Sequence, residues 1–209
     1  EQEVAIKLIR PVHLLAPAEV RAHLVERFEN ERQLLARLQH PNVARIIDGG
    51  STAAGLPYLV MEYIAGLPLT EHCRLRLPGV RERLVLFAKV CDGVQEAHRH
   101  LIVHRDLKPE NVLVQADGEP RLLDFGIARL LGHDGLADGT AESALSAMTP
   151  AYASPEQVRR QPLTTSSDVY SLGVMLYNLL TDTRPYELAG LSPAMAERVV
   201  CEAAVEPLA

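Results

Sequence analysis

The chain of 209 residues has few cysteines, no excess of positive charge and no long apolar segment. Its three cysteines, Cys73, Cys91 and Cys201, are odd in number and far apart, which argues against a disulfide framework and predicts reduced, partly buried thiols. A formal net charge of −6 argues against nucleic acid as a partner, because phosphate neutralisation needs clustered lysine and arginine. The longest apolar run, near residues 169–180, is broken by polar side chains, so we expect no membrane contact from this segment.

The composition, with 47% hydrophobic and 23% charged residues, is that of a globular protein rather than a disordered one. Neither a signal peptide nor an internal repeat is visible, and together with reduced cysteines this predicts a cytoplasmic location. The chain opens within an apparent strand and stops soon after a helical pattern. We therefore expect a fragment that is truncated at both ends.

Hydrophobic periodicity divides the chain into a β-rich part, residues 1–65, and a mainly helical part, residues 66–209, so the expected fold class is α+β. In the first part we expect strands at residues 4–9, 43–48 and 58–63, and an amphipathic helix at 18–39 whose apolar face includes Phe28, Leu34, Leu35 and Leu38. In the second part we expect helices at residues 80–100, 166–181 and 195–204, and a hairpin of strands at 112–114 and 122–123.

The second part also contains signals for a buried helix face, a helix cap and a loop. The helix at residues 80–100 should bury a stripe that runs from Leu84 to Leu101. Ser166 or Ser167 should cap the helix that follows. Residues 130–149 are polar and aperiodic, which is typical of a functional loop.

Two acidic motifs carry the chemistry of the sequence. The first is the string His104-Arg105-Asp106-Leu107-Lys108-Pro109-Glu110-Asn111, and the second, Asp124-Phe125-Gly126, begins thirteen residues after it. The intervening hairpin would bring three oxygen-bearing side chains, those of Asp106, Asn111 and Asp124, to one site. Mg²⁺ prefers such oxygen ligands with one or two carboxylates, and phosphoryl transfer needs the metal together with an acceptor for the proton of the attacking hydroxyl.

These motifs resemble those of the protein kinase family, and Leu-Lys-Pro-Glu-Asn is similar to its serine/threonine branch. The resemblance implies two lobes, a small β-rich N-lobe and a larger helical C-lobe, and transfer of the γ-phosphoryl group of ATP to serine and threonine hydroxyls of protein substrates. It implies that Asp106 is the catalytic base and that Asn111 and Asp124 hold Mg²⁺, with Mn²⁺ as an alternative. The other residues of the two motifs have implied supporting roles: Lys108 at the transferred phosphoryl group, and His104, Arg105, Phe125 and Gly126 as structural residues.

Lys7 ends an apolar strand, where a lysine is normally a solvated edge charge. Upstream of the catalytic string it resembles the kinase lysine that holds the α- and β-phosphates of ATP. That lysine needs a carboxylate partner from the following helix. Glu31 is the expected partner, because it shares the apolar helix face, where an unpaired carboxylate would be costly, and Glu26 and Glu29 are the competing candidates.

The last strand of the first part resembles the kinase hinge. An adenine ring needs apolar walls together with backbone donors and acceptors, which a strand leaving its sheet supplies. The resemblance assigns the following residues to adenine: Met61 as the limit of the back pocket, Glu62 and Ile64 through their backbones, and Ala5 and Leu113 above and below the ring.

The string Met148-Thr149-Pro150-Ala151-Tyr152-Ala153-Ser154-Pro155-Glu156 resembles the end of a kinase activation segment, with Met148 in place of the usual glycine and Ser-Pro-Glu in place of Ala-Pro-Glu. By this resemblance Thr149 supports the catalytic groups and Glu156 has a structural role. Asp168 matches the helix aspartate that anchors the catalytic loop, although an aspartate in a first helical turn also favours the helix dipole. The phrases around Ser154 and Asp168 look bacterial, of the kind that a membrane anchor or helical repeats often follow.

Arg105 suggests control by phosphorylation, because a phosphate paired with an arginine can order a loop. The acceptors available between residues 130 and 149 are Thr140, Ser143 and Ser146. We expect autophosphorylation of Ser143 or Ser146, for which two chains would dimerise.

Two other functions compete with this interpretation. The chain could be a weak or dead kinase fragment that acts as a binding module, because the family's glycine-rich phosphate loop should lie just before Glu1 and the terminal helices, with the arginine that pairs with Glu156, are absent. A zinc site could instead gather His98, His100 and His104, although no cysteine lies nearby in sequence.

Overall fold

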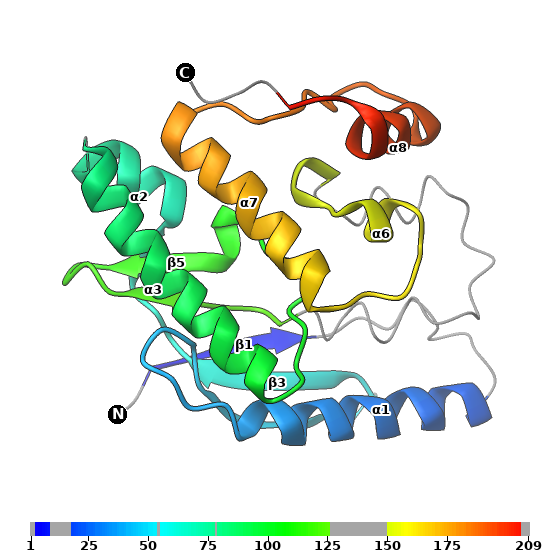
Figure 1. Ribbon diagram of the computed structural model, residues 1–209. Helices are drawn as coiled ribbons and strands as arrows, with labels where there is room; N and C mark the ends of the chain where they lie inside the picture. Colours follow the sequence, from blue (N-terminus) through cyan, green and yellow to red (C-terminus); the bar gives the residue numbers. More distant parts are fainter. Residues whose placement is uncertain (1–2, 9–17, 54, 78, 126–149, 206–209) are drawn as a thin grey trace.

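The computed structural model describes residues 3–8, 18–53, 55–77, 79–125 and 150–205 (Figure 1). It is an α+β fold, as the sequence predicts: strands and one long helix form the first part, and helices dominate the second. The predicted division after residue 65 falls just before strand β4, which begins at Gly66, and stays a prediction.

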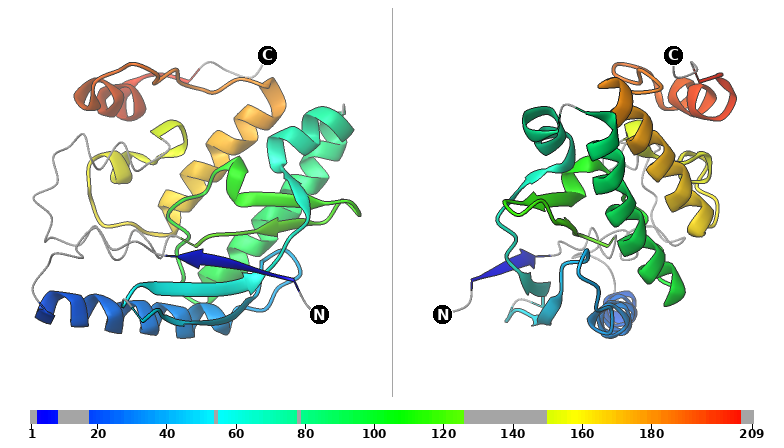
Figure 2. Two further views of the ribbon diagram at one scale, coloured as in Figure 1. Left: turned by 180° about the vertical axis from the view of Figure 1, so that it is seen from behind. Right: turned by 60° about the vertical axis from the view of Figure 1, so that its left-hand side comes forward.

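The first sheet is antiparallel, in the order β1 (Val4–Leu8), β3 (Pro57–Glu62) and β2 (Ile46–Ser51). The alternation of strand side chains turns Ala5 and Lys7 inward while their neighbours on β1 are exposed. Pairing sets Lys7 opposite Leu59 and Ala5 opposite Met61. Helix α1 (Ala18–Ala36) packs against β2 and β3 of this sheet and runs beside it in the left view of Figure 2. Lys7 is therefore held on a face that looks into the molecule.

The expected strand at residues 43–48 begins later, at Ile46. The segment before it pairs with the other sheet instead, because the Asn42 carbonyl accepts the Leu122 N–H (2.8 Å) and the Ala44 N–H donates to the Leu122 carbonyl (2.9 Å). Helix α3 (Val80–Arg99) lies close to the same segment at Gly93, where a Cβ would come within 3.0 Å of the Asn42 carbonyl oxygen. The two sheets are thus joined through the backbone of residues 42–44.

The second sheet contains β4 (Gly66–Pro68), β5 (Val112–Gln115) and β6 (Pro120–Leu122) in that order. The predicted hairpin is confirmed, because β5 and β6 are antiparallel neighbours joined by a turn with Gly118 at φ 83°. A short 3₁₀ turn, Pro109–Asn111, leads directly into β5, so that the first acidic motif stands at one end of the hairpin and the second follows its other end.

Five helices build the rest of the described chain: α2 (Leu69–Arg76), α3 (Val80–Arg99), α6 (Pro155–Val158), α7 (Thr165–Thr181) and α8 (Pro193–Glu202), with a 3₁₀ turn at Pro150–Tyr152. Helices α3 and α7 pack side by side, and α8 packs on α6 (Figures 1 and 2). One cluster of buried apolar side chains extends from Phe28 of α1 through Val90 of α3 to Met175 of α7, so both sheets share a single core.

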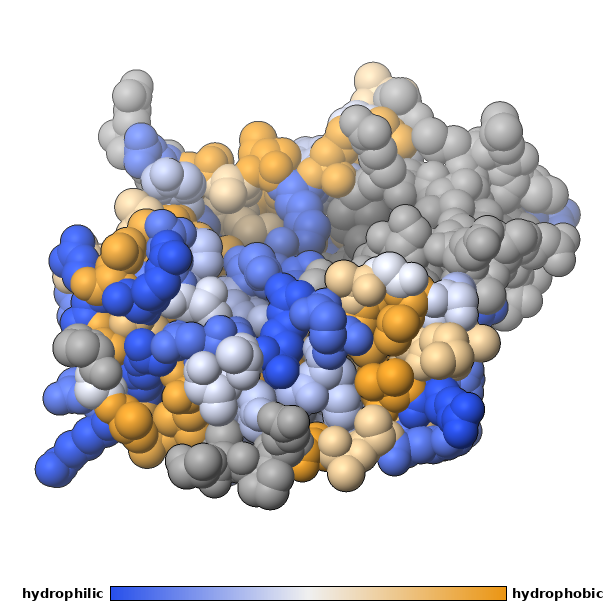
Figure 3. All heavy atoms as spheres, turned by 90° about the horizontal axis from the view of Figure 1, so that it is seen from above, coloured by the Kyte–Doolittle hydropathy of each residue, from blue (hydrophilic) through white to orange (hydrophobic). Residues whose placement is uncertain are grey.

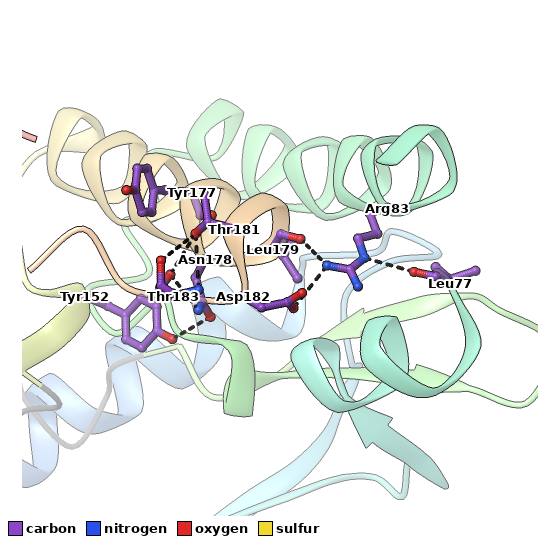
Figure 4. Close-up of polar contacts among 9 residues, drawn as sticks. All are labelled: Leu77, Arg83, Tyr152, Tyr177, Asn178, Leu179, Thr181, Asp182 and Thr183. Carbon is purple, nitrogen blue, oxygen red and sulfur yellow. Dashed lines mark hydrogen bonds and ion pairs between the residues drawn. The ribbon is translucent and has the colours of Figure 1, made fainter. Parts of the chain in front are cut away.

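The C-terminal end of α7 is fixed by a buried arginine (Figure 4). Arg83 of α3 donates to the Leu77 carbonyl (2.9 Å) and to the Leu179 carbonyl (2.6 Å), and it pairs with Asp182 (3.1 Å). Each of these bonds satisfies a carbonyl or carboxylate at a helix end, which is where backbone groups lack intrahelical partners.

None of the helices in the described part of the chain is long and apolar enough to cross a bilayer. The face seen from above in Figure 3 carries polar and apolar residues side by side.

Three sequence expectations about side chains were wrong. Leu34 (44% exposed) lies at the margin of the buried face of α1, and Leu84 (42%) and Leu101 (91%) do not belong to the buried stripe of α3. Helix α3 ends at Arg99, so Leu101 lies outside the helix and does not continue its buried face. The cap of α7 is Thr164 rather than a serine, with Ser167 at the third position completing a capping box.

Leu101, just after the cap of α3, has a left-handed conformation (φ 59°), and the Ile102 N–H donates to the Ala97 carbonyl (3.0 Å), an arrangement that favours glycine. Because its side chain is almost fully exposed, Leu101→Gly should raise the free energy of unfolding by about 1 kcal/mol. Urea denaturation measures this change. The same substitution at Leu84, inside α3, should lower the free energy of unfolding by about 1 kcal/mol. If Leu101→Gly destabilised the protein, the left-handed conformation of Leu101 would not be costly.

Candidate active site

Asp168, in the first turn of α7, is a carboxylate with only 2% of its side chain exposed. Its Oδ2 accepts the backbone N–H of His104 (2.7 Å) and contacts Nε2 of His98 (2.8 Å), and its Oδ1 accepts the N–H of Arg105 (2.9 Å). Several donors to one buried carboxylate offset the cost of its desolvation. Asp168 thereby fixes the loop that carries Asp106.

His104 is fully buried, and this burial lowers the pKa of its imidazole although the nearby Asp168 carboxylate opposes the shift. The ring is therefore neutral at physiological pH. Its Nε2 lies 2.8 Å from the Leu123 carbonyl and can only donate there, so Nδ1 is the acceptor for the Asp106 N–H at 3.3 Å. The ring also packs against Phe125, with centroids 4.7 Å apart. His104 thus links the loop of Asp106 to the residue before Asp124.

Asp106, Asn111 and Lys108 form a compact polar cluster. The Asn111 amide Nδ2 donates to the Asp106 carbonyl (2.7 Å) and to its carboxylate Oδ2 (3.1 Å). The Lys108 ammonium lies 3.2 Å from the same carboxylate oxygen. Because Nδ2 of Asn111 is engaged in this way, the amide oxygen is the atom that it can offer to a ligand.

Asp124 follows β6, and its Oδ1 forms an ion pair of 2.8 Å with the Lys7 ammonium of β1. Asp124 is a non-glycine residue at φ 56°, and the preceding Leu123 N–H donates to the Asn111 carbonyl (2.8 Å). The site therefore brings Lys7 of the first sheet to an acidic group beside Asn111.

A pocket opens between α1, the first sheet and the second acidic motif. The residues that line it are Lys7, Leu35, Ala44, Ile46, Leu59, Met61, Asp124 and Phe125. Apolar walls with a few charged groups at one end are usual for ligand pockets. The pocket contains Lys7, Asp124 and Met61 among the residues that the sequence singled out.

Glu31 is not the partner of Lys7 in this structure, since the ion pair of Lys7 among the described residues is with Asp124. Burial raises the pKa of the Glu31 carboxyl, and the positive charges of Arg105 and Arg27 oppose this shift. Glu29, a competing candidate, pairs with Arg32 (2.7 Å) instead. The sequence indicates the face of α1 on which Glu31 lies, but it does not indicate how that helix is rotated relative to β1.

The other residues assigned to adenine are not among those that line this pocket. Ala5 is half-buried on β1 opposite Met61, and Leu113 is half-buried on β5. Glu62 ends β3, where its N–H donates to the Arg45 carbonyl (3.0 Å), and Ile64 is buried shortly after it.

Glu156, in the first turn of α6, accepts a hydrogen bond from the Ser167 hydroxyl (3.4 Å). Its own backbone N–H, followed by the Ser154 hydroxyl, lowers the pKa of this carboxyl. The remaining assigned residues lie outside the residues that the structure describes: Gly126, Thr140, Ser143, Ser146 and Thr149.

The three histidines of the zinc alternative turn to separate partners. His98 contacts Asp168, His100 contacts the Glu96 carbonyl through Nδ1 (3.0 Å), and His104 donates to Leu123. Within the described ranges, no three or more His, Cys, Asp or Glu side chains gather as metal ligands. The geometry gives the zinc alternative no support.

Two residues that hold the loop of Asp106 are not indicated by the sequence. His98 is a candidate metal ligand by sequence, but in the structure its ring contacts Asp168. Gln157 of α6 donates from Nε2 to the Arg105 carbonyl (2.6 Å). A Ser-x-x-Gln capping box is visible at Ser154–Gln157, but nothing in the sequence says that the same amide reaches the catalytic loop.

Asp168→Ala should lower the free energy of unfolding by about 3 kcal/mol, because two buried backbone N–H groups would lose their acceptor. Thermal or urea unfolding measures the loss. Asp92→Ala, which removes an exposed carboxylate from the middle of α3, is the matched control and should change stability by less than about 0.5 kcal/mol. Equal effects of the two substitutions would mean that Asp168 does not anchor the loop.

Comparison with known proteins agrees with this geometry. Residues 1–202 match the family model described as "Protein kinase domain". The chain is 36% identical over 211 residues to "Serine/threonine-protein kinase PknB" of Mycolicibacterium smegmatis, which covers 99% of this chain and 32% of that protein. It is 35% identical over 213 residues to the protein of the same name from Mycobacterium tuberculosis, covering 100% of this chain and 33% of that protein.

A third relative comes from a different group of bacteria. "Serine/threonine-protein kinase pkn3" of Myxococcus xanthus is 37% identical over 194 residues, covering 90% of this chain and 34% of that protein. The chain thus spans about a third of the length of these relatives. With the match to the family model extending over nearly all of its residues, the chain belongs to the protein kinase domain family.

Proposed function

We propose that this chain is the catalytic domain of a serine/threonine protein kinase that transfers the γ-phosphoryl group of ATP to hydroxyls of protein substrates. The observation that carries the proposal is the convergence of Asp106, Asn111 and the Lys7–Asp124 pair. Asn111 bonds Asp106 through its amide, and the backbone N–H before Asp124 bonds Asn111. The bacterial relatives named as serine/threonine kinases support the choice of hydroxyl substrate.

The donor atoms fit a hard divalent cation. The Asp124 carboxylate and the Asn111 amide oxygen are hard ligands, as Mg²⁺ and Mn²⁺ require, and they would hold the ion. Bound Mg²⁺ would supply positive charge to the phosphate oxygens of ATP. In the structure, the Lys7 ammonium pairs with Oδ1 of Asp124; when ATP binds, the carboxylate would turn to the metal and the ammonium to phosphate oxygens.

The remaining groups act at the reacting end. Asp106 would orient the substrate hydroxyl and accept its proton, with its carboxylate held in place by the Asn111 amide. Lys108 lies beside that carboxylate and would stabilise the charge on the transferred group. Thr149 would support both of them. After autophosphorylation in a dimer, the Arg105 side chain would pair with a phosphate carried by Thr140, Ser143 or Ser146.

The apolar pocket would take the adenine ring. Met61 belongs to its lining and Ala5 lies opposite Met61 on the neighbouring strand, which would give the ring one wall. Leu113 would supply the other wall, and the backbones of Glu62 and Ile64 would bond the edge of the ring.

One observation favours the alternative of a kinase-like binding module. Lys7 is paired with Asp124, a candidate metal ligand, and not with Glu31. A chain in which Lys7 stayed paired with Asp124 would bind nucleotide poorly, and its function would be to bind other proteins. Phosphoryl transfer by the wild type separates the two functions.

Asp106→Asn should lower kcat by about 10²- to 10⁴-fold, because the amide cannot accept the substrate proton. Transfer of radioactive phosphate from γ-labelled ATP to casein measures the effect. Asp117→Asn, the same substitution in the exposed turn between β5 and β6, is the control and should leave kcat within twofold of the wild-type value. Equal rates for Asp106→Asn and the wild type would refute the assignment of the base.

Glu31→Gln tests whether Glu31 takes over Lys7 once ATP frees it from Asp124. The loss of this partner should lower kcat/KM for ATP at least about tenfold, a change of roughly 1.4 kcal/mol in transition-state stabilisation. Glu26→Gln, at an exposed position of the same helix, should leave kcat/KM unchanged. If both variants behave like the wild type, Glu31 has no part in binding ATP.

A further inference from the structure

Arg105, the residue before Asp106, has a backbone conformation that only its surroundings can maintain. Its φ of 68° lies in the left-handed region, which costs a non-glycine residue about 1–2 kcal/mol. Such a conformation persists where several contacts determine it together. One contact is already described: the Arg105 N–H donates to Asp168 of α7.

The second contact comes from Gln157 of α6, whose Nε2 donates to the Arg105 carbonyl at 2.6 Å. Asp168 and Gln157 therefore hold the two sides of Arg105, its N–H and its carbonyl. That carbonyl belongs to the peptide bond that carries the Asp106 nitrogen. A shift of the Gln157 amide would be transmitted directly to the backbone of Asp106.

Gln157 is itself fixed in orientation. It is buried (8% exposed), its Oε1 accepts the Ser154 N–H at 2.9 Å, and its own N–H donates to the Ser154 hydroxyl at 3.3 Å. Because the amide oxygen is taken by Ser154, the amide nitrogen must face Arg105, where only a donor fits. The residue thus caps α6 with one atom and holds the catalytic loop with the other.

Segment 152–154, which leads into α6, is held on its other side by α7. The Ser171 hydroxyl donates to the Tyr152 carbonyl (2.8 Å), and the Tyr152 hydroxyl donates to Asn178 (3.2 Å). Figure 4 shows the Tyr152 ring directed at Asn178, which in turn donates to the Thr183 carbonyl (2.9 Å). This segment and the catalytic loop line a common pocket that contains Asp106, Tyr152 and Gln157.

We propose that Gln157 is a positioning residue for the reaction proposed above: its amide couples the segment at residues 152–157 to the backbone that carries Asp106. The inference rests on the proposed function for its effect on catalysis. The hydrogen bond itself can be tested without catalysis.

Gln157→Glu is the discriminating variant, since it has the same shape and a carboxylate at this position still completes the capping box with Ser154. It replaces the donor to Arg105 with an acceptor, so the bond is lost and the new oxygen repels the Arg105 carbonyl. A displacement of the base by a fraction of an ångström is enough to slow the reaction, so kcat should fall at least about tenfold. KM for ATP should stay within twofold of the wild-type value, because Lys7 and Asp124 are untouched.

Gln161→Glu is the matched control, with the same change of charge at an exposed position just beyond α6. It should leave kcat and KM within twofold of the wild type. Gln157→Ala removes both bonds of the amide, and it should lower the melting temperature as well as kcat. A fall in kcat at an unchanged KM for ATP in Gln157→Glu, measured below the melting temperature of the variant, separates positioning from folding.

Hydrogen exchange followed by mass spectrometry tests the bond directly. Amides of a peptide that covers residues 102–108 should exchange at least about tenfold faster in Gln157→Glu than in the wild type or Gln161→Glu. Unchanged exchange overturns the proposal, and so does a kcat within twofold of an active wild type. If the wild type transfers no phosphate, the proposed function fails, and the exchange rates alone then decide whether Gln157 holds the loop.

Discussion

The buried carboxylate of Asp168 is the constraint on which the site depends. A charge with almost no contact with water must be surrounded by donors, and here two consecutive backbone N–H groups and an imidazole provide them. The most deeply buried charge of the site therefore belongs not to a candidate reacting group but to the residue of α7 that anchors the loop. Asp106 and Lys108 remain half-exposed at the surface of a loop whose backbone cannot move independently of α7.

A second constraint joins the two acidic motifs. Neutral His104 donates to the Leu123 carbonyl and accepts from the Asp106 N–H, and the Leu123 N–H returns to Asn111. These hydrogen bonds between neutral groups fix the position of Asp106, the candidate base, relative to that of Asp124. Lys7 then connects this arrangement to the first sheet by a partly exposed ion pair, an interaction weak enough to be exchanged for phosphate.

Much of this could be predicted from the sequence, because the relevant signals are local. The hairpin follows from Ala116-Asp117-Gly118 between apolar runs, and the elements that carry Lys7, Asp106 and Asp124 follow from their strings. What could not be predicted depends on rigid-body placement. The rotation of α1 decides whether Glu31 contacts Lys7. The hydrogen bond from Gln157 to Arg105 joins residues 52 positions apart, and neither segment contains a local sequence signal for it. Leu101 shows a smaller limit, since a 3.6-residue period does not indicate where a helix ends.

The contact between Gly93 and Asn42 lies where helix α3 meets the segment that joins the two sheets. A methyl group on Gly93 would crowd the Asn42 carbonyl oxygen, so one of the two segments would have to shift by a few tenths of an ångström. The smallest residue of α3 therefore limits how closely this helix can approach the backbone of residues 42–44.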